Sequence, residues 1–306
     1  MGPTASGKTD LAVRMVESLP LEIISVDSAL VYRGMDIGTA KPGPEILARA
    51  PHRLIDIRDP EDAYSAAEFR EDALSAMQEI TQSGRTPLLV GGTMLYFRIL
   101  ERGLSDLPKA DPGLRARLEA ELQNLGLTSL HQRLQSLDPK AAQRIHPHDP
   151  QRILRALEVI ELTGRPMTEM QEANRGQALP YRLLKLVLAP KNREILHKRI
   201  EQRFHKMLEQ GFQDEVKQLV QKRNLTPDLP SMRSVGYRQM LRYLFGELEW
   251  GEMAEKGIIA TRQLAKRQYT WLRADHDCFW LDDEEGDLLQ QVRQLLRQQM
   301  PELNTK

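Results

Sequence analysis

Residues 2–9 read Gly2-Pro3-Thr4-Ala5-Ser6-Gly7-Lys8-Thr9, the pattern G-x-x-x-x-G-K-T of a phosphate-binding loop. Small residues in such a loop let successive backbone N–H groups converge on phosphate oxygens. Lys8 supplies a positive charge, Thr9 offers its hydroxyl to a magnesium ion, and the helix predicted over residues 10–19 points its N-terminus at the anion. The sequence therefore predicts that residues 2–9 bind phosphate together with Mg²⁺.

The chain after this loop alternates between strand-like and helix-like segments. Residues 21–26 form a short β-branched run typical of a buried strand, and residues 87–92 indicate a strand followed by a tight turn. Between them, Ser65 and Glu68 form a capping box that predicts a helix ending near Gly84. This alternation favours an α/β fold with a parallel sheet flanked by helices.

The position of the loop at the start of the chain is unusual. A phosphate loop normally follows a buried strand, whereas only Met1 precedes this one. Because a central strand is hard to dispense with, we expect the sequence to begin late, with that strand outside it.

Strand-like sequence disappears over residues 111–177. Asp149-Pro150 supplies an N-cap and a first-turn proline there, and strand-like sequence resumes at residues 183–188. The stretches with helical spacing are residues 114–122, 127–137 and 153–162. We therefore expect an all-helical insertion domain at 111–177 in a P-loop α/β core formed by residues 1–110 and 178–306.

Composition limits the class of protein. Lysine plus arginine and aspartate plus glutamate each number 43, which excludes a globally basic nucleic-acid coat but allows a local basic face. Cys278 is the only cysteine, so the sequence excludes an intrachain disulfide or a paired-cysteine zinc site and favours a cytoplasmic protein. No run approaches the roughly 18 apolar residues of a membrane span. We expect a monomer.

The phosphate loop alone leaves the reaction open. A small-molecule or nucleotide kinase is one reading, although the strand at 87–92 ends in Gly91-Gly92 and lacks the aspartate expected to hold magnesium. Asp27 ends the strand at 21–26 and could act as a base, hold metal through water, or cap a turn. A GTPase-like module would need an Asn-Lys-x-Asp motif, which the sequence lacks.

Five further segments carry a specific signature when taken together with residues 2–9. They are residues 25–42 (SVDSALVYRGMDIGTAKP), 90–96 (VGGTMLY), 149–158 (DPQRILRALE), 233–239 (RSVGYRQ) and 266–273 (KRQYTWLR). In sequence and order they resemble the bacterial tRNA dimethylallyltransferases, also called tRNA isopentenyltransferases. The resemblance covers nearly the whole chain and implies a fold like that of P-loop kinases with a helical insertion domain.

The same resemblance implies an activity. A dimethylallyl group would pass from dimethylallyl diphosphate to N6 of the adenosine just 3′ of the anticodon, in tRNAs that read codons starting with U. Lys8, Thr9 and Mg²⁺ would offset the charge on the departing diphosphate, and Arg203, from a basic segment at 182–206, would reach it. Asp27 would accept the proton of the adenine amine, which is a poor nucleophile.

The resemblance also implies a tRNA-binding set. Arg262, Lys266, Tyr269 and Arg273 recur at helical spacing, which predicts a basic stripe with one aromatic ring for backbone contact and stacking, or else an ordinary solvated face. The full set is Asp27, Ser28, Ala29, Leu30, Thr93, Arg115, Gln151, Arg152, Ile153, Leu154, Arg155, Arg233, Ser234, Val235, Gly236, Tyr237, Arg238, Lys266, Arg267, Gln268, Tyr269, Thr270, Trp271, Leu272 and Arg273.

Overall fold

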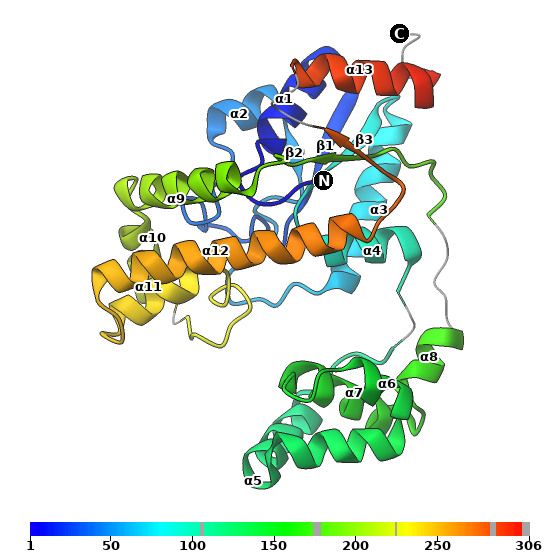
Figure 1. The fold of residues 1–306 in the computed structure, drawn as a ribbon, viewed down its shortest axis with the longest axis vertical. Helices are drawn as coiled ribbons and strands as arrows, with labels where there is room; N and C mark the ends of the chain where they lie inside the picture. The colour runs from blue at the N-terminus through cyan, green and yellow to red at the C-terminus, as the bar shows by residue number, and fades with distance from the viewer. Residues whose placement is uncertain (105–106, 174–178, 224, 282–285, 302–306) are drawn as a thin grey trace. The chain divides into compact units, whose positions relative to one another are not determined.

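The protein is described from a computed structural model that places residues 1–104, 107–173, 179–223, 225–281 and 286–301 (Figure 1). It divides into a core unit, Met1–Phe97 with Tyr181–Lys306, and a helical unit, Arg98–Pro180. The helical unit is wider than the expected 111–177. One reason is that Arg155 and Glu158 bind the backbone of Pro108 and Asp111, which ties the preceding segment to the helices.

The elements outside the helical unit alternate as the sequence predicts, and α4 runs from the core unit into the helical unit. In chain order they are α1 (Lys8–Ser18), β1 (Leu21–Val26), α2 (Pro44–Arg49), β2 (His52–Arg53), α3 (Ala66–Gln82), β3 (Thr86–Gly91), α4 (Met94–Arg102), β4 (Lys185–Leu188), α9 (Arg193–Glu209), α10 (Phe212–Arg223), α11 (Tyr237–Leu244), α12 (Trp250–Arg273), β5 (Cys278–Leu281) and α13 (Leu288–Gln299).

The strands form two parallel sheets. β1 is central in the order β2-β1-β3, with Ile23 opposite His52 and Val26 opposite Gly91, so the carboxyl ends of β1 and β3 lie together. β4 pairs with β5 in the second sheet. The backbone of Met1 continues the edge of β4, because its amine donates to Leu186 O at 2.7 Å and its carbonyl accepts from Leu188 N at 2.9 Å.

Apolar side chains cover the central strand on both faces. Ile23 and Ile24, which point to opposite faces of β1, are both fully buried, as expected for a parallel sheet between helices. On one face, the α1 residues Leu11 and Met15 pack in the same cluster as Val292 of α13. This packing confirms the α/β class and fixes α1, and hence the start of that helix at Lys8, against the sheet.

A layer of helices adjoins the sheet region. The 24-residue α12 packs along α9 and α11 (Figure 1). The predicted capping box at the start of α3 is confirmed: Ser65 Oγ accepts from Glu68 N, and Glu68 Oε2 accepts from Ser65 N. Within the described part of the chain, no helix has the length and apolar character needed to cross a membrane.

The helical unit has a core of its own. Its elements are α5 (Pro112–Leu137), α6 (Pro139–Arg144), α7 (Pro150–Thr163) and α8 (Met167–Ala173). α5 breaks at Gly126, whose φ of 78° and ψ of 161° are not helical, and this separates the two predicted helical stretches. Leu118 and Leu134 of α5 and Leu157 of α7 are fully buried in one apolar cluster.

Candidate active site

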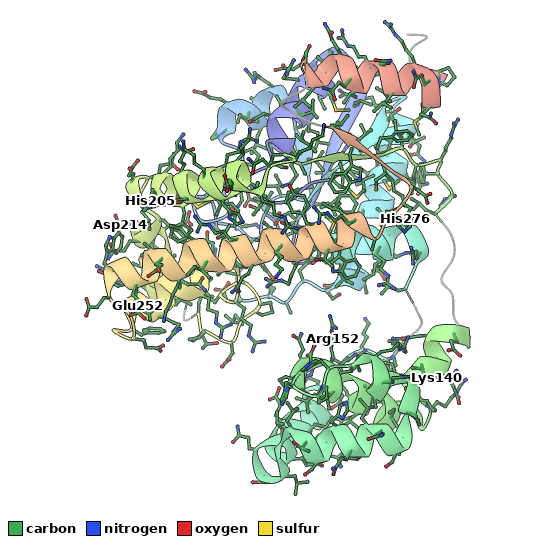
Figure 2. All side chains as sticks on the ribbon, in the orientation of Figure 1. Lys140, Arg152, His205, Asp214, Glu252 and His276 are labelled. Atoms are coloured by element: carbon green, nitrogen blue, oxygen red, sulfur yellow. The ribbon has the colours of Figure 1, made fainter. Side chains whose placement is uncertain are left out.

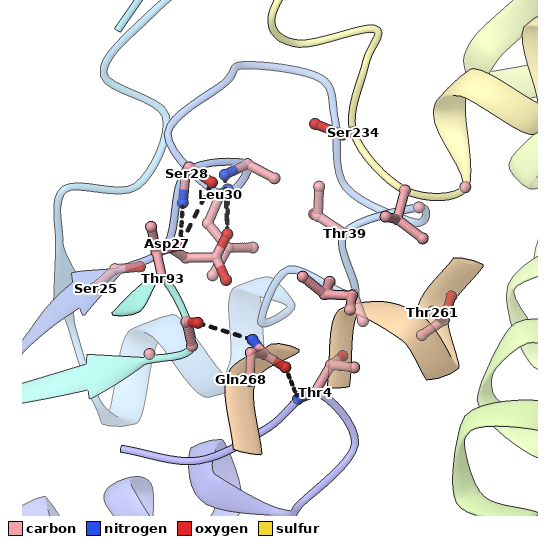
Figure 3. A pocket seen from close by; sticks show the side chains of 18 of the residues that line it. Thr4, Ser25, Asp27, Ser28, Leu30, Thr39, Thr93, Ser234, Thr261 and Gln268 are labelled. Carbon is pink, nitrogen blue, oxygen red and sulfur yellow. Dashed lines mark hydrogen bonds between the residues drawn. The ribbon is translucent and has the colours of Figure 1, made fainter. Parts of the chain in front are cut away.

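A cavity of about 600 Å³ lies beyond the carboxyl ends of β1 and β3 (Figure 3). Its wall comes from widely separated segments: the phosphate loop, the turns after β1 and β3, α9, the segment before α11, and α12. Lys8, Asp27, Thr93, Arg203 and Arg267 all line it. Ligands of open parallel sheets bind at this end of the strands, so the fold places the predicted phosphate and base residues around one space.

The phosphate loop lies on one side of this cavity. Ala5 and Gly7 adopt positive φ angles of 62° and 83°, a conformation that lets a chain turn tightly, and α1 then begins at Lys8. Not every amide of the loop faces a ligand, however. Thr4 N donates to Gln268 Oε1 at 2.9 Å, so this predicted phosphate-binding residue uses its N–H within the protein.

Lys8, Arg203 and Asp27 set the electrostatics at the phosphate-loop side of the cavity. Burial lowers the pKa of Lys8 to about 8, an effect that Asp27 opposes and Arg203 reinforces. Burial also lowers the pKa of Arg203, again opposed by Asp27, and the Arg203 guanidinium donates to Thr39 O at 3.1 Å. Half-buried cations that outnumber the nearby carboxylates favour a multiply charged anion. Lys198 and Lys206, from the same basic segment, are exposed.

Asp27 holds the turn that follows β1. Its Oδ1 accepts from Ala29 N at 2.9 Å and Leu30 N at 3.3 Å, so the turn-capping role considered from sequence is real. Among the described residues, nothing donates to Oδ2, which leaves that oxygen for an incoming group. Thr93 Oγ1 accepts from Ser28 N at 3.0 Å, and Thr93 N donates to Val26 O, so Thr93 anchors the turn.

Glu215 of α10 fixes a second loop at the cavity, residues 36–38. Its carboxylate accepts from the backbone N–H groups of Asp36, Ile37 and Gly38 at 2.9, 2.6 and 3.1 Å, and from the Tyr237 hydroxyl at 2.5 Å. Burial and this carboxylate raise the pKa of Tyr237. Sequence reasoning missed Glu215, because its backbone partners lie far away in the chain and form no local pattern.

We expect Glu215→Gln to lower the free energy of unfolding by about 1–3 kcal/mol, since an amide cannot accept all four bonds and loses their charge assistance. Tyr237→Phe, which removes one of the four, should lose about 1 kcal/mol. Urea unfolding of both variants checks this order. Equal stability of Glu215→Gln and the parent protein would mean that the loop does not depend on the carboxylate.

Many residues of the predicted tRNA-binding set do reach the cavity. Those that line it are Asp27, Ser28, Ala29, Leu30, Thr93, Arg233, Ser234, Val235, Gly236, Tyr237, Arg267, Gln268 and Trp271. Two of them cannot offer a free side chain to RNA: Tyr237 is fully buried and bound to Glu215, and Gln268 is buried with both ends of its amide bonded. Arg238 and Thr270 are exposed but do not line the cavity.

α12 presents a different face to the cavity from the one the basic stripe predicts. Arg267, Gln268 and Trp271 line the cavity, whereas Lys266 and Arg273 are exposed elsewhere on the helix. The predicted stacking role of Tyr269 is wrong. Its ring is buried, stacks on Trp280 with centroids 6.3 Å apart, and its hydroxyl donates to Pro190 O at 2.8 Å. Leu272 is also buried, since both occupy the packed side of the helix.

One residue of the predicted stripe, Arg262, forms an ion pair within the protein. Arg262 donates to Glu201 of α9 at 2.9 Å. This contact ties α12 to α9 and makes Arg262 a structural member of the stripe.

The predicted tRNA-binding residues in the helical unit also need correction. Ile153 and Leu154 belong to its apolar core, so they do not contact RNA through their side chains. Arg115 and Arg155 both donate to the buried Glu158, at 2.9 and 2.8 Å. The Arg115 bond joins α5 to α7, whereas Arg155 lies on α7 together with Glu158. Gln151 and Arg152 are exposed, and Figure 2 shows Arg152 projecting from α7. These two side chains remain accessible candidates.

The residues present fit a magnesium ion only in part. No cluster of three or more histidine, cysteine or acidic side chains suited to a metal occurs in the described ranges. Thr9 and Ser25 line the cavity, and the buried Ser25 hydroxyl has no hydrogen-bond partner. Mg²⁺ in phosphate-transfer sites is commonly held by one or two protein oxygens together with substrate phosphates and water, which suits this donor set.

Comparison with known proteins identifies relatives over the whole chain. A family model described as IPP transferase matches residues 30–275. The structure is similar to the tRNA isopentenylpyrophosphate transferase of Bacillus halodurans, at 38% identity over 99% of this chain and 95% of that one, with a TM-score of 0.71. It is also similar to the tRNA delta(2)-isopentenylpyrophosphate transferase of Staphylococcus epidermidis, at 32% identity over 97% of each chain, with a TM-score of 0.70.

A third solved structure is that of a eukaryotic dimethylallyltransferase acting on tRNA. It is 26% identical, with a TM-score of 0.82, over 100% of this chain and 79% of that one. The extra length therefore lies in the eukaryotic relative.

Proposed function

The chain belongs to the IPP transferase family, and we propose that it transfers a dimethylallyl group from dimethylallyl diphosphate to tRNA, releasing diphosphate. The acceptor is N6 of the adenosine 3′-adjacent to the anticodon in tRNAs that read codons starting with U. The observation that carries this proposal is a single cavity with an anion-binding end, formed by Lys8 and Arg203, and a carboxylate, Asp27, whose Oδ1 caps the turn after β1.

The reaction needs both parts of the cavity. The bond between the allylic carbon and the diphosphate oxygen breaks, the diphosphate takes the electron pair, and the adenine N6 forms the new bond to carbon. Lys8 and Arg203 offset the charge that grows on the diphosphate, where fixed cations lower the barrier most. The N6 proton passes to Oδ2 of Asp27, whose other oxygen is held by the turn.

In this proposal, Mg²⁺ would bind together with the diphosphate. Thr9, and the unpartnered Ser25 hydroxyl, would hold the ion, which supplies positive charge at the diphosphate oxygens when it is bound.

The adenine must leave the stacked anticodon loop to enter such a cavity. Arg233, Arg267 and Trp271 are exposed and line the cavity, so they are suited to RNA at its mouth: the arginines to phosphates and the indole to a base face. Exposed Arg152 provides a separate phosphate contact on the helical unit.

The decisive experiment combines the protein with dimethylallyl diphosphate, Mg²⁺ and tRNA from cells that lack this modification. Nucleoside mass analysis should show N6-dimethylallyladenosine and an equal amount of released diphosphate. A parallel reaction with ATP tests the kinase alternative. Phosphoryl transfer from ATP, or a folded protein that yields no prenylated nucleoside, would overturn the proposal.

We expect Arg267→Ala to weaken tRNA binding and to reduce the slope of log affinity against log salt by about 0.7–0.9, the amount for one lost phosphate contact. Affinity for dimethylallyl diphosphate should not change. Arg297→Ala, an exposed arginine on α13 away from the cavity, is the matched control and should bind tRNA normally. An unchanged salt slope for Arg267→Ala would show that this side chain is only solvated.

A further inference from the structure

Gln268 connects the two working parts of the cavity. It lies on α12, its side chain is only 7% exposed, and its amide makes one bond from each end. Oε1 accepts from Thr4 N in the phosphate loop at 2.9 Å, and Nε2 donates to Gly92 O at 2.8 Å (Figure 3). Both partners are backbone groups far from Gln268 in sequence, so this one side chain bridges the phosphate loop and the turn after β3.

The hydrogen bond from Gln268 Nε2 to Gly92 O holds the turn that precedes Thr93. Thr93 follows directly, and its hydroxyl accepts from Ser28 N, the residue after Asp27. The contact is also close: a Cβ on Gly92 would lie 2.4 Å from Gln268 Nε2, so a side chain at this position would displace the Gln268 amide. A shift of Gln268 would therefore move the turn and, through Thr93, the segment that carries Asp27.

We propose that Gln268 is a positioning residue that sets the distance between the phosphate loop and the Asp27 turn, and that it does not bind tRNA. This inference rests on the proposed function. In-line transfer requires the allylic carbon, held through its diphosphate, to meet an amine held at Asp27, and a misplacement of about 1 Å can cost roughly 100-fold in rate. A buried amide whose two ends are both bonded to loop backbone is placed to hold those loops rather than to reach RNA.

The test compares Gln268→Met, which keeps the length of the side chain and removes both bonds, with Gln263→Met, the same change at an exposed position on the same helix. At saturating tRNA and dimethylallyl diphosphate, the single-turnover rate of Gln268→Met should fall about 10- to 100-fold while its Kd for tRNA stays within about twofold of the parent value. Gln263→Met should match the parent protein in both.

A double-mutant cycle shows whether Gln268 acts through the turn. If it works through Gly92 and Thr93, the losses for Gln268→Met and Thr93→Ala should overlap, so the double variant is far less impaired than the product of the two single losses. If Gln268→Met fails to fold in thermal melts, Gln268→Glu takes its place, because its carboxylate still accepts from Thr4 N and, when ionised, has no N–H to donate to Gly92 O.

The outcomes distinguish a failure of the positioning role of Gln268 from a failure of the proposed prenyl transfer. A parent-like rate at saturating substrates, a loss confined to tRNA affinity, or fully multiplicative losses in the cycle would overturn the positioning role. An inactive parent protein in the same assay would instead count against the proposed function, and the inference would fall with it.

Discussion

Asp27→Asn is expected to lower the single-turnover rate of prenyl transfer by about 10²–10⁴-fold, the usual range for a general base, while both substrates still bind. The substitution suits the structure. The Asn side-chain oxygen can still accept from Ala29 N and Leu30 N, so the turn after β1 is kept, whereas the amide cannot take the proton that Oδ2 accepts. An interaction needed only in the transition state is lost from the rate and not from ground-state affinity.

The measurement pairs single-turnover transfer with equilibrium tRNA binding. Thr9→Ala is the useful comparison, because weaker magnesium and diphosphate anchoring should also raise the apparent KM for dimethylallyl diphosphate. Circular dichroism and thermal melting of Asp27→Asn should match the parent protein. A near-normal single-turnover rate would leave Asp27 as a turn-capping residue and nothing more.

Features that depend on neighbouring residues were predictable from sequence. The Ser65–Glu68 capping box and the Asp149 cap of α7 each involve atoms within a few residues, so their patterns are local. β1 and β3 follow from short apolar runs between turn signals. The α/β class follows from the order of these elements.

Features that depend on which face of an element is buried were not predictable. On α12, helical spacing placed Tyr269 with Lys266 and Arg273 and could not show that its ring packs under Trp280. In α7, the motif that contains Arg152 also contains Ile153 and Leu154, which directly follow it but lie on the buried face of the helix. A motif found by resemblance therefore mixes residues of the site with residues of the core.

Long-range hydrogen bonds were the features that the sequence could predict least. Glu215 meets loop 36–38, and Gln268 meets Thr4 and Gly92, from positions more than a hundred residues away. No composition or spacing signals such partners. The same holds for the charge state of Lys8, which depends on burial and on Asp27 and Arg203 around it.

That charge state makes substrate binding depend on pH. In the substrate-free protein, Lys8 loses its proton as the pH rises through about 8. A bound diphosphate favours the protonated form and so raises the pKa of Lys8 in the complex. By linkage, the affinity for dimethylallyl diphosphate is then greatest below pH 8 and falls by up to about tenfold per pH unit above it.

The free energy of unfolding of the substrate-free protein changes in the opposite direction. The buried cation costs stability below pH 8, and this cost is relieved as the pH rises from about 8 toward 10.5, because the unfolded chain keeps its proton longer.

Lys8→Met is therefore expected to weaken dimethylallyl diphosphate binding at pH 7 by at least about 30-fold, since losing one partner of a buried charge pair costs about 2–5 kcal/mol. It should also remove the extra pH dependence above 8. Calorimetric titration without tRNA, from pH 6.5 to 9.5, measures both effects, and the ratio of the two proteins' affinities cancels the ionisation of the ligand itself. That ratio should shrink as the pH rises, because the parent protein loses the cation that the variant never had. A constant ratio across the series would mean that Lys8 stays charged throughout, and its burial would not control binding.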